Sequence, residues 1–362
     1  MNAFLLHLKR LDWTLITSAL LLFGIGLLSI YSSSLGRGDF SNFQKQLIFG
    51  ALGLVLMFGL SFFNWRAFRD DPYFILTLYF IGILALLGLF FFAPEVRGVR
   101  RWYQLGFISV DPAEFLKVIL VILFAKYFST KHIEMYRIRH ILLSGLYVVL
   151  PSVLLFFQPD LGSVLIFFGL WIGILLISGI RTRHFLILAL CGILAFVFAW
   201  NFLMLDYQKA RILSFLQPRD PLGSAWSQNQ SKIAIGSGGI FGKGFGAGSQ
   251  TQFGFLPEPH TDFIFAAIAE EFGLAGVMVL LSLFLTLFWK TAKIALDATS
   301  NFPRLFAAGF ALVLISKTFI NIGMNIGIFP IVGIPLPLVS YGGSSLTATF
   351  IGLGILQSIK AN

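Results

Sequence analysis

The sequence predicts an all-α integral membrane protein with ten transmembrane helices. Of its 362 residues, 57% are hydrophobic and only 12% are charged, and the mean hydropathy is +0.87. A soluble domain carries about 25% charged residues, so this chain cannot cover a water-facing surface with polar groups. Apolar runs of about 20 residues recur along the chain, and a helix of that length crosses a hydrocarbon core of about 30 Å. We expect a single polytopic membrane domain over residues 1–362.

Ten apolar runs give the expected helices, because the backbone polar groups of a lipid-embedded segment must pair internally. The first run is too long for a signal peptide and lacks a clean cleavage pattern, so we expect an uncleaved span. The fourth run is short and the eighth begins with acidic residues. The expected spans cover residues 12–31, 45–63, 73–93, 114–128, 140–157, 161–179, 184–203, 264–289, 305–326 and 341–359.

Lysine and arginine residues in the short connections predict the orientation. With a cytoplasmic N-terminus, fourteen of them fall on the inner side and five on the outer side, namely Arg37, Lys45, Arg97, Arg100 and Arg101. This bias follows the positive-inside rule, so we expect both termini on the cytoplasmic side of the inner membrane. The net charge of +10 is then mostly a topology signal, and we expect no nucleic-acid partner.

One connection, residues 205–263, is far longer than the others and falls on the outer side between the seventh and eighth spans. A connection of this length is usually functional or disordered, and its composition suggests partial order. Its glycine run "GSGGIFGKGFGAGS" does not match a nucleotide-binding loop, because Ser237 and Gly244 occupy positions that need Gly and Ser or Thr. The run is either a flexible linker or a set of backbone N–H groups that, with Lys243, holds a lipid-linked phosphate.

The stretch "FLPEPHTDFIFAAIAEEFG" closes this loop with a dense group of ionisable residues. Asp262 lies where the loop meets the eighth span, so it, or Thr261, is a candidate cap for that helix. Ionisable groups at a membrane edge are unfavourable and often mark function, which gives the alternative interpretation. Glu258 and His260 belong to the same group, and His260 is the only one of five histidines on the outer side.

Charged and amide residues inside the spans form a second set of candidates. Glu114 and Lys117 are three residues apart, so they share a helical face and are a plausible ion pair; snorkelling of Lys117 to the interface is the alternative. Lys317, Asn321 and Asn325 follow at intervals of four residues and form a polar stripe. This stripe either hydrogen-bonds neighbouring helices or lines a watery cavity.

Two irregular segments on the outer side add further candidates. "FPIVGIPLPLVSYGGSS" contains Ser340, and its prolines and Gly-Gly pair cannot continue a helix. Such backbone lines a cavity, packs inside the protein or makes an ordinary outer turn. "FQPDLGS" is a tight turn in which Asp160 is also placed to start the next helix. The single cysteine, Cys191, excludes an intrachain disulfide, and we expect it to be a buried core residue.

Several long blocks resemble the SEDS family (shape, elongation, division and sporulation) over nearly the whole chain. They are "RRWYQLG", "FQPDLGS", "SKIAIGSGGIFGKGFGAGSQTQ", "FLPEPHTDFIFAAIAEEFG" and "NIGMNIGIFPIVGIPLPLVSYGGSS". Val332 stands where division-type members commonly carry Lys, which favours the elongation type. The family's Gln-Pro-Ser-Glu is Asp111-Pro112-Ala113-Glu114 here, which leaves roles tied to that Gln or Ser in doubt.

The resemblance implies a peptidoglycan glycosyltransferase that polymerises lipid II at the outer face of the cytoplasmic membrane. The expected partners are a class B penicillin-binding protein with transpeptidase activity, the elongation machinery and membrane lipids. The family's essential aspartate falls on Asp262, and its charged pair on the fourth span falls on Glu114 and Lys117. Candidate substrate contacts are Arg101, Glu114, Lys117, Asp160, Lys243, Glu258, His260, Thr261, Lys317, Asn321 and Ser340.

The implied reaction inverts an α-linked pyrophosphate donor into a β-1,4 bond, so one base must take the proton of the acceptor hydroxyl. We expect Asp262 to be that base. Developing pyrophosphate charge needs fixed cations such as Arg97, Arg100, Arg101, Lys117 or Lys243, or a divalent cation, Mg²⁺ or Mn²⁺, held partly by Asp262 or Glu258. No cofactor is otherwise expected.

Two alternative functions are a lipid II flippase and a scaffold without activity. A transporter often has two pseudo-symmetric halves with broken helices in matching positions. Here one loop holds most of the polar residues and the first half of the chain has no counterpart, which favours the enzyme. A scaffold predicts no loss of activity specific to Asp262.

Overall fold

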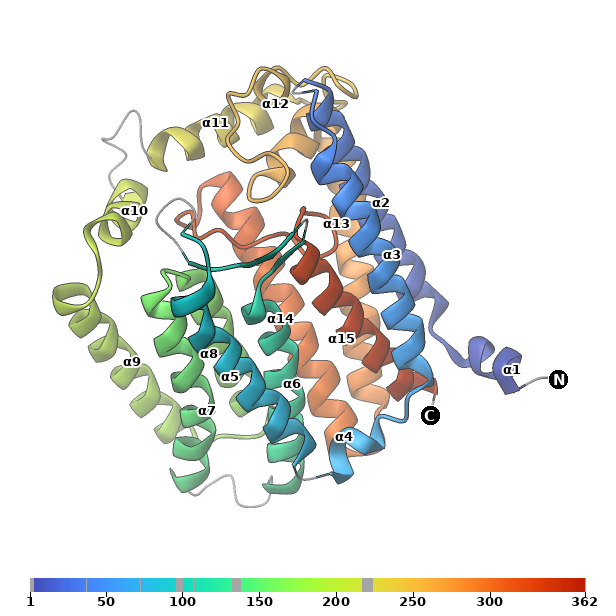
Figure 1. Ribbon diagram of the computed structural model, residues 1–362, viewed down its shortest axis with the longest axis vertical. Helices are drawn as coiled ribbons and strands as arrows, with labels where there is room; N and C mark the ends of the chain where they lie inside the picture. The colour runs from blue at the N-terminus through green and yellow to red at the C-terminus, as the bar shows by residue number, and fades with distance from the viewer. Residues whose placement is uncertain are drawn as a thin grey trace.

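The computed structural model describes residues 3–36, 38–71, 73–95, 100–106, 108–131, 138–216 and 224–361, which are predominantly helical. Each expected span coincides with a helix, and the fourth is longer than expected (Figure 1). These helices are α2 (Trp13–Leu35), α3 (Ser41–Phe62), α5 (Phe74–Phe92), α6 (Pro112–Lys131), α7 (Ile138–Phe157), α8 (Leu161–Ile177), α9 (Thr182–Phe202), α13 (Ile264–Asp297), α14 (Asn301–Ile326) and α15 (Gly343–Ala361).

Seven of these helices, within the described part of the chain, have the length and apolar composition of a membrane span: α2, α3, α5, α7, α9, α13 and α14. Of the others, α8 is apolar but only 17 residues long, whereas α6 and α15 carry more polar residues. The remaining helices are shorter and flank the bundle: α1 (Ala3–Arg10), α4 (Arg66–Asp70), α10 (Asp206–Leu216), α11 (Ser224–Ser237) and α12 (Ser249–Gln252).

The centre of the bundle is formed by α15, α14 and α6, with α3, α2 and α13 on one side and α5 and α8 on the other. Glycines bring α15 close to α3: a Cβ atom on Gly53 would lie 2.4 Å from the Phe350 ring, and one on Gly354 would lie 2.8 Å from the Met57 carbonyl oxygen. Small residues allow such close approach of helices where lipid supplies no hydrophobic drive. Nearly every side chain of α15 is therefore buried.

Helix α9 contrasts with this centre because none of its residues is buried, and Figure 1 shows it at the edge of the bundle. Cys191 lies on α9 and is exposed, so the expectation of a buried core cysteine is wrong. A run that is apolar on all sides does not reveal whether it faces protein or lipid, which is why the sequence misled.

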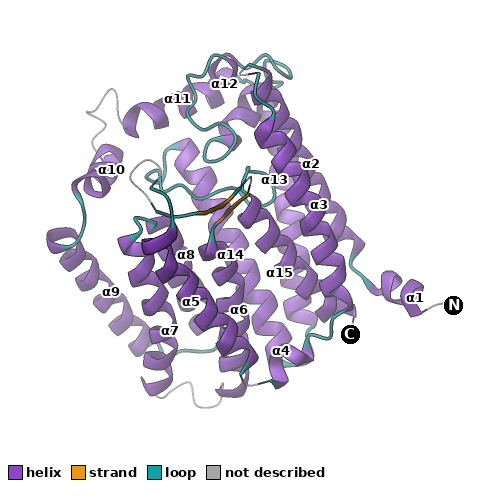
Figure 2. Ribbon diagram, viewed as in Figure 1, coloured by secondary structure: helices purple, strands orange, loops and turns teal. Residues whose placement is uncertain are grey.

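A small antiparallel hairpin, absent from the sequence-based expectations, precedes α6. Strands β1 (Tyr103–Leu105) and β2 (Ile108–Val110) pair with Tyr103 opposite Val110. Gly106 in the turn has φ +62°, a conformation that favours glycine. Figure 2 shows this hairpin near the end of the bundle that carries α10, α11 and α12. The two termini lie at the opposite end (Figure 1).

The described residues of the long connection, 205–263, form three helices, α10, α11 and α12, joined by shorter segments. Its glycine run does not behave as a flexible linker, because it packs tightly on α13: a Cβ atom on Gly238 would lie 1.9 Å from the Ala269 carbonyl oxygen. Helix α13 itself is kinked at Gly273, where φ is 64° and ψ is −164°. The end of the bundle that holds this connection and the hairpin is called the site end below.

Candidate functional site

A cavity of about 360 Å³ opens at the site end between α3, α6, the hairpin, the segment before α13 and the segment before α15. Its wall combines aromatic rings with charged and hydroxyl side chains. The lining residues are Phe49, Arg101, Trp102, Ser109, Asp111, Glu114, Glu258, Thr261, Asp262, Gly333, Pro335, Tyr341, Gly342, Gly343, Ser344 and Ser345. A cavity with a few convergent polar groups among apolar walls is typical of a ligand site.

Asp262 contributes its carboxylate to this cavity. Helix α13 begins at Ile264 with Phe263 as its N-cap, and no side chain caps it, so the helix-cap interpretation of Asp262 and Thr261 is wrong. Burial raises the pKa of Asp262 from its usual 3.8 to about 6; Arg101 opposes this shift and Glu258 adds to it. Within the described residues, the carboxylate has no hydrogen-bond or ion-pair partner. It is therefore positioned to exchange a proton with a ligand.

The backbone that carries Asp262 is held at three consecutive carbonyl groups. The Tyr341 N–H donates to His260 O at 2.8 Å, and the Ser340 hydroxyl donates to Thr261 O at 2.6 Å. Asn321 and Asn325 both donate through Nδ2 to Asp262 O, at 3.2 and 2.9 Å.

These contacts settle the role of the polar stripe on α14. Both amide side chains are fully buried, and neither belongs to the cavity wall. Asn321 also donates to Ile334 O at 2.8 Å, and Asn325 accepts from the Ala266 N–H at 3.3 Å. The stripe therefore binds the backbone on either side of Asp262. From the sequence, the stripe either hydrogen-bonds neighbouring helices or lines a watery cavity. The two asparagines make hydrogen bonds inside the protein, but their partners are loop backbone and the first turn of α13.

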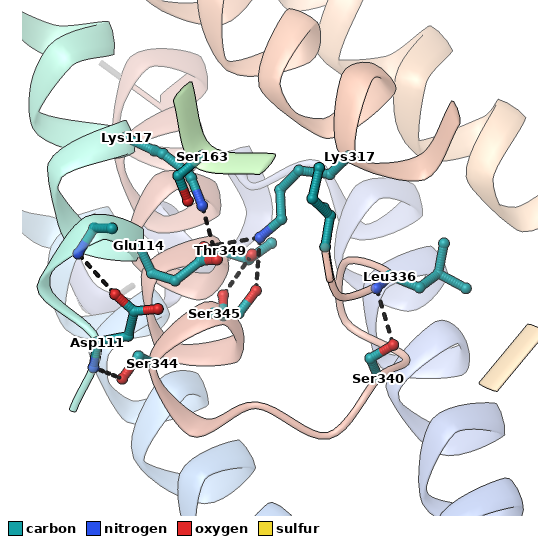
Figure 3. A network of polar contacts seen from close by, with 12 residues as sticks. Asp111, Glu114, Lys117, Ser163, Lys317, Leu336, Ser340, Ser344, Ser345 and Thr349 are labelled. Carbon is teal, nitrogen blue, oxygen red and sulfur yellow. Dashed lines mark hydrogen bonds and ion pairs between the residues drawn. The ribbon is translucent and has the colours of Figure 1, made fainter. Parts of the chain in front are cut away.

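Glu114 is a second carboxylate on the cavity wall, and it is saturated (Figure 3). Its Oε1 accepts from Lys117 Nζ at 2.8 Å, and its Oε2 accepts from Lys317 Nζ at 2.8 Å. Lys317 Nζ also donates to Ser345 Oγ at 2.6 Å. The expected pair of Glu114 and Lys117 is confirmed, and Lys117 is only 2% exposed, so it does not snorkel. The third member, Lys317, comes from a distant span.

Arg101 occupies the hairpin side of the cavity between two carboxylates. Its guanidinium lies 3.0 Å from Asp111 and 3.1 Å from Asp160. Burial alone would lower the pKa of Arg101, but Asp160 and Asp111 outweigh it and hold that pKa above its ordinary value. Asp160 also caps α8 by accepting from the Ser163 N–H at 3.1 Å, as its position in the turn suggested.

Asp111, where this chain departs from the family pattern, has three contacts besides its place on the cavity wall. It pairs with Arg101, its Oδ1 accepts from the Ala113 N–H at 2.9 Å, and its own N–H donates to Ser344 Oγ at 2.8 Å. Burial raises the pKa of Asp111. A carboxylate thus ties the hairpin to the starts of α6 and α15.

Seven of the eleven expected substrate contacts do not line the cavity, namely Lys117, Asp160, Lys243, His260, Lys317, Asn321 and Ser340. Lys243 donates to Glu270 and Ser249, each at 2.8 Å, and does not line the wall. The His260 ring is buried and bonds to Ser33 Oγ at 2.6 Å. Arg97 lies outside the described residues, and Arg100 makes an exposed pair with Glu95.

The acidic group of the sequence therefore divides in two. Glu258 and Asp262 face the cavity, whereas Glu270 and Glu271 are buried in α13 and bond to the connection 205–263 and to α2. Sequence reasoning missed the aromatic wall of Phe49, Trp102 and Tyr341. The blocks "RRWYQLG" and "SYGGSS" were the available signals for Trp102 and Tyr341, and nothing in the sequence marked Phe49.

Among the described residues, no cluster of three or more His, Cys, Asp or Glu side chains has the arrangement of a metal site. The two carboxylates at Glu258 and Asp262 nevertheless face one cavity. Mg²⁺ is usually bound through one or two carboxylates together with substrate phosphates and water, so these residues fit a cation that arrives with a phosphorylated ligand.

The chain is similar to known proteins along almost its entire length. A family model described as cell cycle protein, FtsW/RodA/SpoVE, matches residues 12–362. The chain is 38% identical to peptidoglycan glycosyltransferase MrdB of Escherichia coli K12, covering 98% of this chain and 94% of the relative. It is 36% identical to stage V sporulation protein E of Bacillus subtilis, covering 96% of each.

Two solved structures share the fold. A chain of a peptidoglycan synthase complex, described as coordinating polymerization and crosslinking, superposes with a TM-score of 0.83 at 29% identity, covering 97% of both chains. The rod shape determining protein RodA of Thermus thermophilus gives a TM-score of 0.71 at 28% identity, covering 97% of this chain and 96% of the other.

Proposed function

Because this chain belongs to the FtsW/RodA/SpoVE family of cell cycle proteins, we infer its activity from that membership: it is a peptidoglycan glycosyltransferase of the elongation type. We propose that it polymerises lipid II into glycan strands and that Asp262 is the general base. The observation that carries the proposal is the carboxylate of Asp262, which faces the cavity without a partner among the described residues while its backbone is held at three carbonyl groups.

In this mechanism Asp262 accepts the proton of the acceptor sugar's 4-hydroxyl group. The hydroxyl oxygen attacks the anomeric carbon of the donor from the face opposite its pyrophosphate. The bond from that carbon to the pyrophosphate oxygen breaks, the configuration inverts, and undecaprenyl pyrophosphate leaves. A base works best when its pKa lies near the working pH, and a pKa of about 6 keeps Asp262 ionised at neutral pH and yet able to hold a proton.

Charge on the leaving group is the second requirement. Arg101 is the one cation on the cavity wall among the described residues, and its two carboxylate partners hold it in place. We propose that it faces the pyrophosphate and that Glu258, beside Asp262, contributes to binding a divalent cation, Mg²⁺ or Mn²⁺. Such a cation, when bound, would neutralise developing negative charge on the pyrophosphate.

We also propose the topology that places this reaction. The inner membrane is the setting. Ten crossings are obtained when α6, α8 and α15 span beside the seven long apolar helices. The bias of lysine and arginine supports cytoplasmic termini, with the site end and the connection 205–263, between the seventh and eighth spans, on the outer side. The whole chain then forms one membrane domain.

A transpeptidase is the partner that this activity needs, because nascent strands must be cross-linked. We propose a class B penicillin-binding protein within the elongation machinery. The fold match to a chain of a synthase complex that couples polymerization and crosslinking supports this assignment.

Polymerisation by the purified chain tests the base. Labelled lipid II should give glycan polymer with the wild type, and Asp262→Asn should lower turnover about 10²–10⁴-fold, the usual contribution of a positioned base. Asp39→Asn is the matched control, because Asp39 is an exposed acid at the site end. Polymer from Asp262→Asn at the wild-type rate would exclude the base assignment, and lipid transport without polymer would support the flippase alternative.

A further inference from the structure

The kink in α13 is an opening that receives another segment of the chain. In an unbroken helix the N–H groups of Leu274 and Ala275 would donate to the carbonyls four residues earlier, at Glu270 and Glu271. Gly273 has φ 64° and ψ −164°, which separates these groups. Four backbone polar groups inside a long apolar helix therefore need other partners, and an unpaired group costs several kcal/mol at membrane depth, about 2–7 by transfer measurements.

Residues 238–244, which we name the spliced loop, supply all four partners. The N–H groups of Leu274 and Ala275 donate to Gly239 O at 2.9 Å and Ile240 O at 3.0 Å. In return, the N–H groups of Lys243 and Gly244 donate to the carbonyl oxygens of Glu270 and Glu271, each at 3.0 Å. The loop is thus bonded into the helix as a replacement for its missing turn.

Glycine is required on both sides of this junction. A Cβ atom on Gly242 would lie 2.1 Å from Glu271 O, and one on Gly273 would lie 2.3 Å from the Gly242 nitrogen. The Glu270 side chain reinforces the junction by accepting from Lys243 Nζ, Ser249 Oγ, Thr251 Oγ1 and the N–H groups of Gln250 and Thr251. The glycine run "GSGGIFGKGFGAGS" does not match a nucleotide-binding loop, and this close packing explains its glycines.

Two polar contacts between α2 and α13 locate the spliced loop relative to the bilayer. Lys290 pairs with Asp12 at 3.3 Å at one end, and Ser32 donates to Glu271 at 2.5 Å at the other. Twenty residues separate Asp12 from Ser32, so the two contacts lie about 30 Å apart along α2 at 1.5 Å per residue. This distance equals the thickness of a hydrocarbon core. Taking the two contacts as the two edges of that core places the junction at Glu270–Ala275 at its site-end boundary with the headgroups.

Apolar side chains project from the spliced loop at this boundary. Phe241 is 84% exposed and Ile240 is 63% exposed, and beside them on α13 Leu274 is 54% exposed. We propose that Ile240 and Phe241 insert into the site-end leaflet of the bilayer as a lipid anchor. Large exposed apolar side chains at this depth have hydrocarbon as their favourable neighbour.

The anchor also fixes the depth of the start of α13, because the spliced loop is bonded to that helix two to three turns from Ile264. Asp262 lies two residues before Ile264. With the proposed base at a constant depth, a substrate that is itself embedded through a lipid tail meets it at a constant height. This consequence rests on the proposed function, whereas the insertion itself does not.

Spin labelling of single cysteines tests the insertion. In a Cys191→Ser background, Phe241→Cys carries a nitroxide label, and power saturation in lipid nanodiscs compares collisions with oxygen and with a water-soluble nickel chelate. Val55→Cys, on the exposed face of α3, is the lipid control, and Asp39→Cys is the water control. We expect the label at 241 to collide mainly with oxygen, as at 55. Accessibility to nickel equal to that at 39, or protection from both reagents, would overturn the anchor.

Activity on membrane-embedded lipid II tests the consequence. We expect Phe241→Ser to lower kcat/KM about fivefold or more, while Phe241→Leu, which keeps an apolar tip, stays within twofold of the wild type. If the nitroxide at position 241 reports lipid but Phe241→Ser and Phe241→Leu are equally active, the proposed role in fixing the depth of the base is overturned. The insertion of the side chain into the bilayer would still stand. An inactive wild type would count against the proposed function and not against the insertion.

Discussion

Glu114 and Asp262 face the same cavity, but their surroundings differ. Glu114 has a lysine on each carboxylate oxygen, and both lysines are buried with it. Asp262 has no such partner among the described residues, and its support comes entirely through the backbone. Two acids in one cavity can therefore serve opposite purposes: a carboxylate with a lysine on each oxygen joins helices, whereas a carboxylate without a partner on a rigid backbone can accept a proton.

The largest expected effect on stability comes from the saturated carboxylate. Removing one partner of a buried ion pair leaves an uncompensated charge, which destabilises by about 3–5 kcal/mol. We therefore expect Glu114→Gln, which leaves Lys117 and Lys317 buried without their shared carboxylate, to lower the thermal unfolding temperature in detergent markedly. Asp262→Asn should leave that temperature unchanged or raise it, since the raised pKa of Asp262 shows that its surroundings disfavour the charge and no described residue pairs with the carboxylate. Equal stability of the two variants would remove the distinction between the acids.

An intermediate effect is expected from the clamp on the Asp262 backbone. Asn325→Ala leaves the buried Asp262 carbonyl with Asn321 alone and removes the acceptor of the Ala266 N–H. An unsatisfied buried group costs about 1–3 kcal/mol. We expect kcat to fall about tenfold, with KM little changed, in steady-state polymerisation.

Asn201→Ala is the control for that measurement, because Asn201 is an exposed asparagine on α9 whose side chain donates to Val197 O of the same helix. A rise in KM with unchanged kcat for Asn325→Ala would show that the clamp acts on substrate binding and would contradict its role in holding the base.

The smallest expected effect concerns pH. A protonated carboxylic acid cannot take a proton, so activity should fall as the pH drops through the pKa of Asp262, about 6. The negative charge of Glu258 contributes to raising that pKa, so Glu258→Gln should lower it. The acid limb of the kcat/KM profile should then move to lower pH, by less than about one unit. An acid limb that stays at the same pH or moves to higher pH would contradict its assignment to Asp262.

Hydropathy predicted the helices of the bundle well, because the bilayer imposes the same length and apolar character on each span. The three-residue spacing of Glu114 and Lys117 predicted their contact, because such a contact depends only on position within one helix. Spacing has no such reach between helices. It could not identify Lys317 as the second partner, because 203 residues separate it from Glu114 and only the packing of α14 on α6 brings them together.

Other features depended on backbone geometry that composition does not reveal. The hairpin at 103–110 is too short for a periodic signal. The glycine run resembled a linker because its partners, the freed backbone groups of α13, exist only once α13 is kinked at Gly273. The sequence singled out Asp262 as a candidate, and the structure places it on the cavity wall, but its support from Asn321 and Asn325 required the tertiary structure.

The most direct test of the difference between the two acids is carbodiimide labelling read by mass spectrometry. These reagents modify protonated carboxyl groups, so labelling across pH 5–8 compares the two residues in one sample of folded protein. The account predicts that Asp262 is modified with a midpoint near pH 6 and that Glu114, held by Lys117 and Lys317, resists throughout. Modification of Glu114 with no reaction at Asp262 would contradict it.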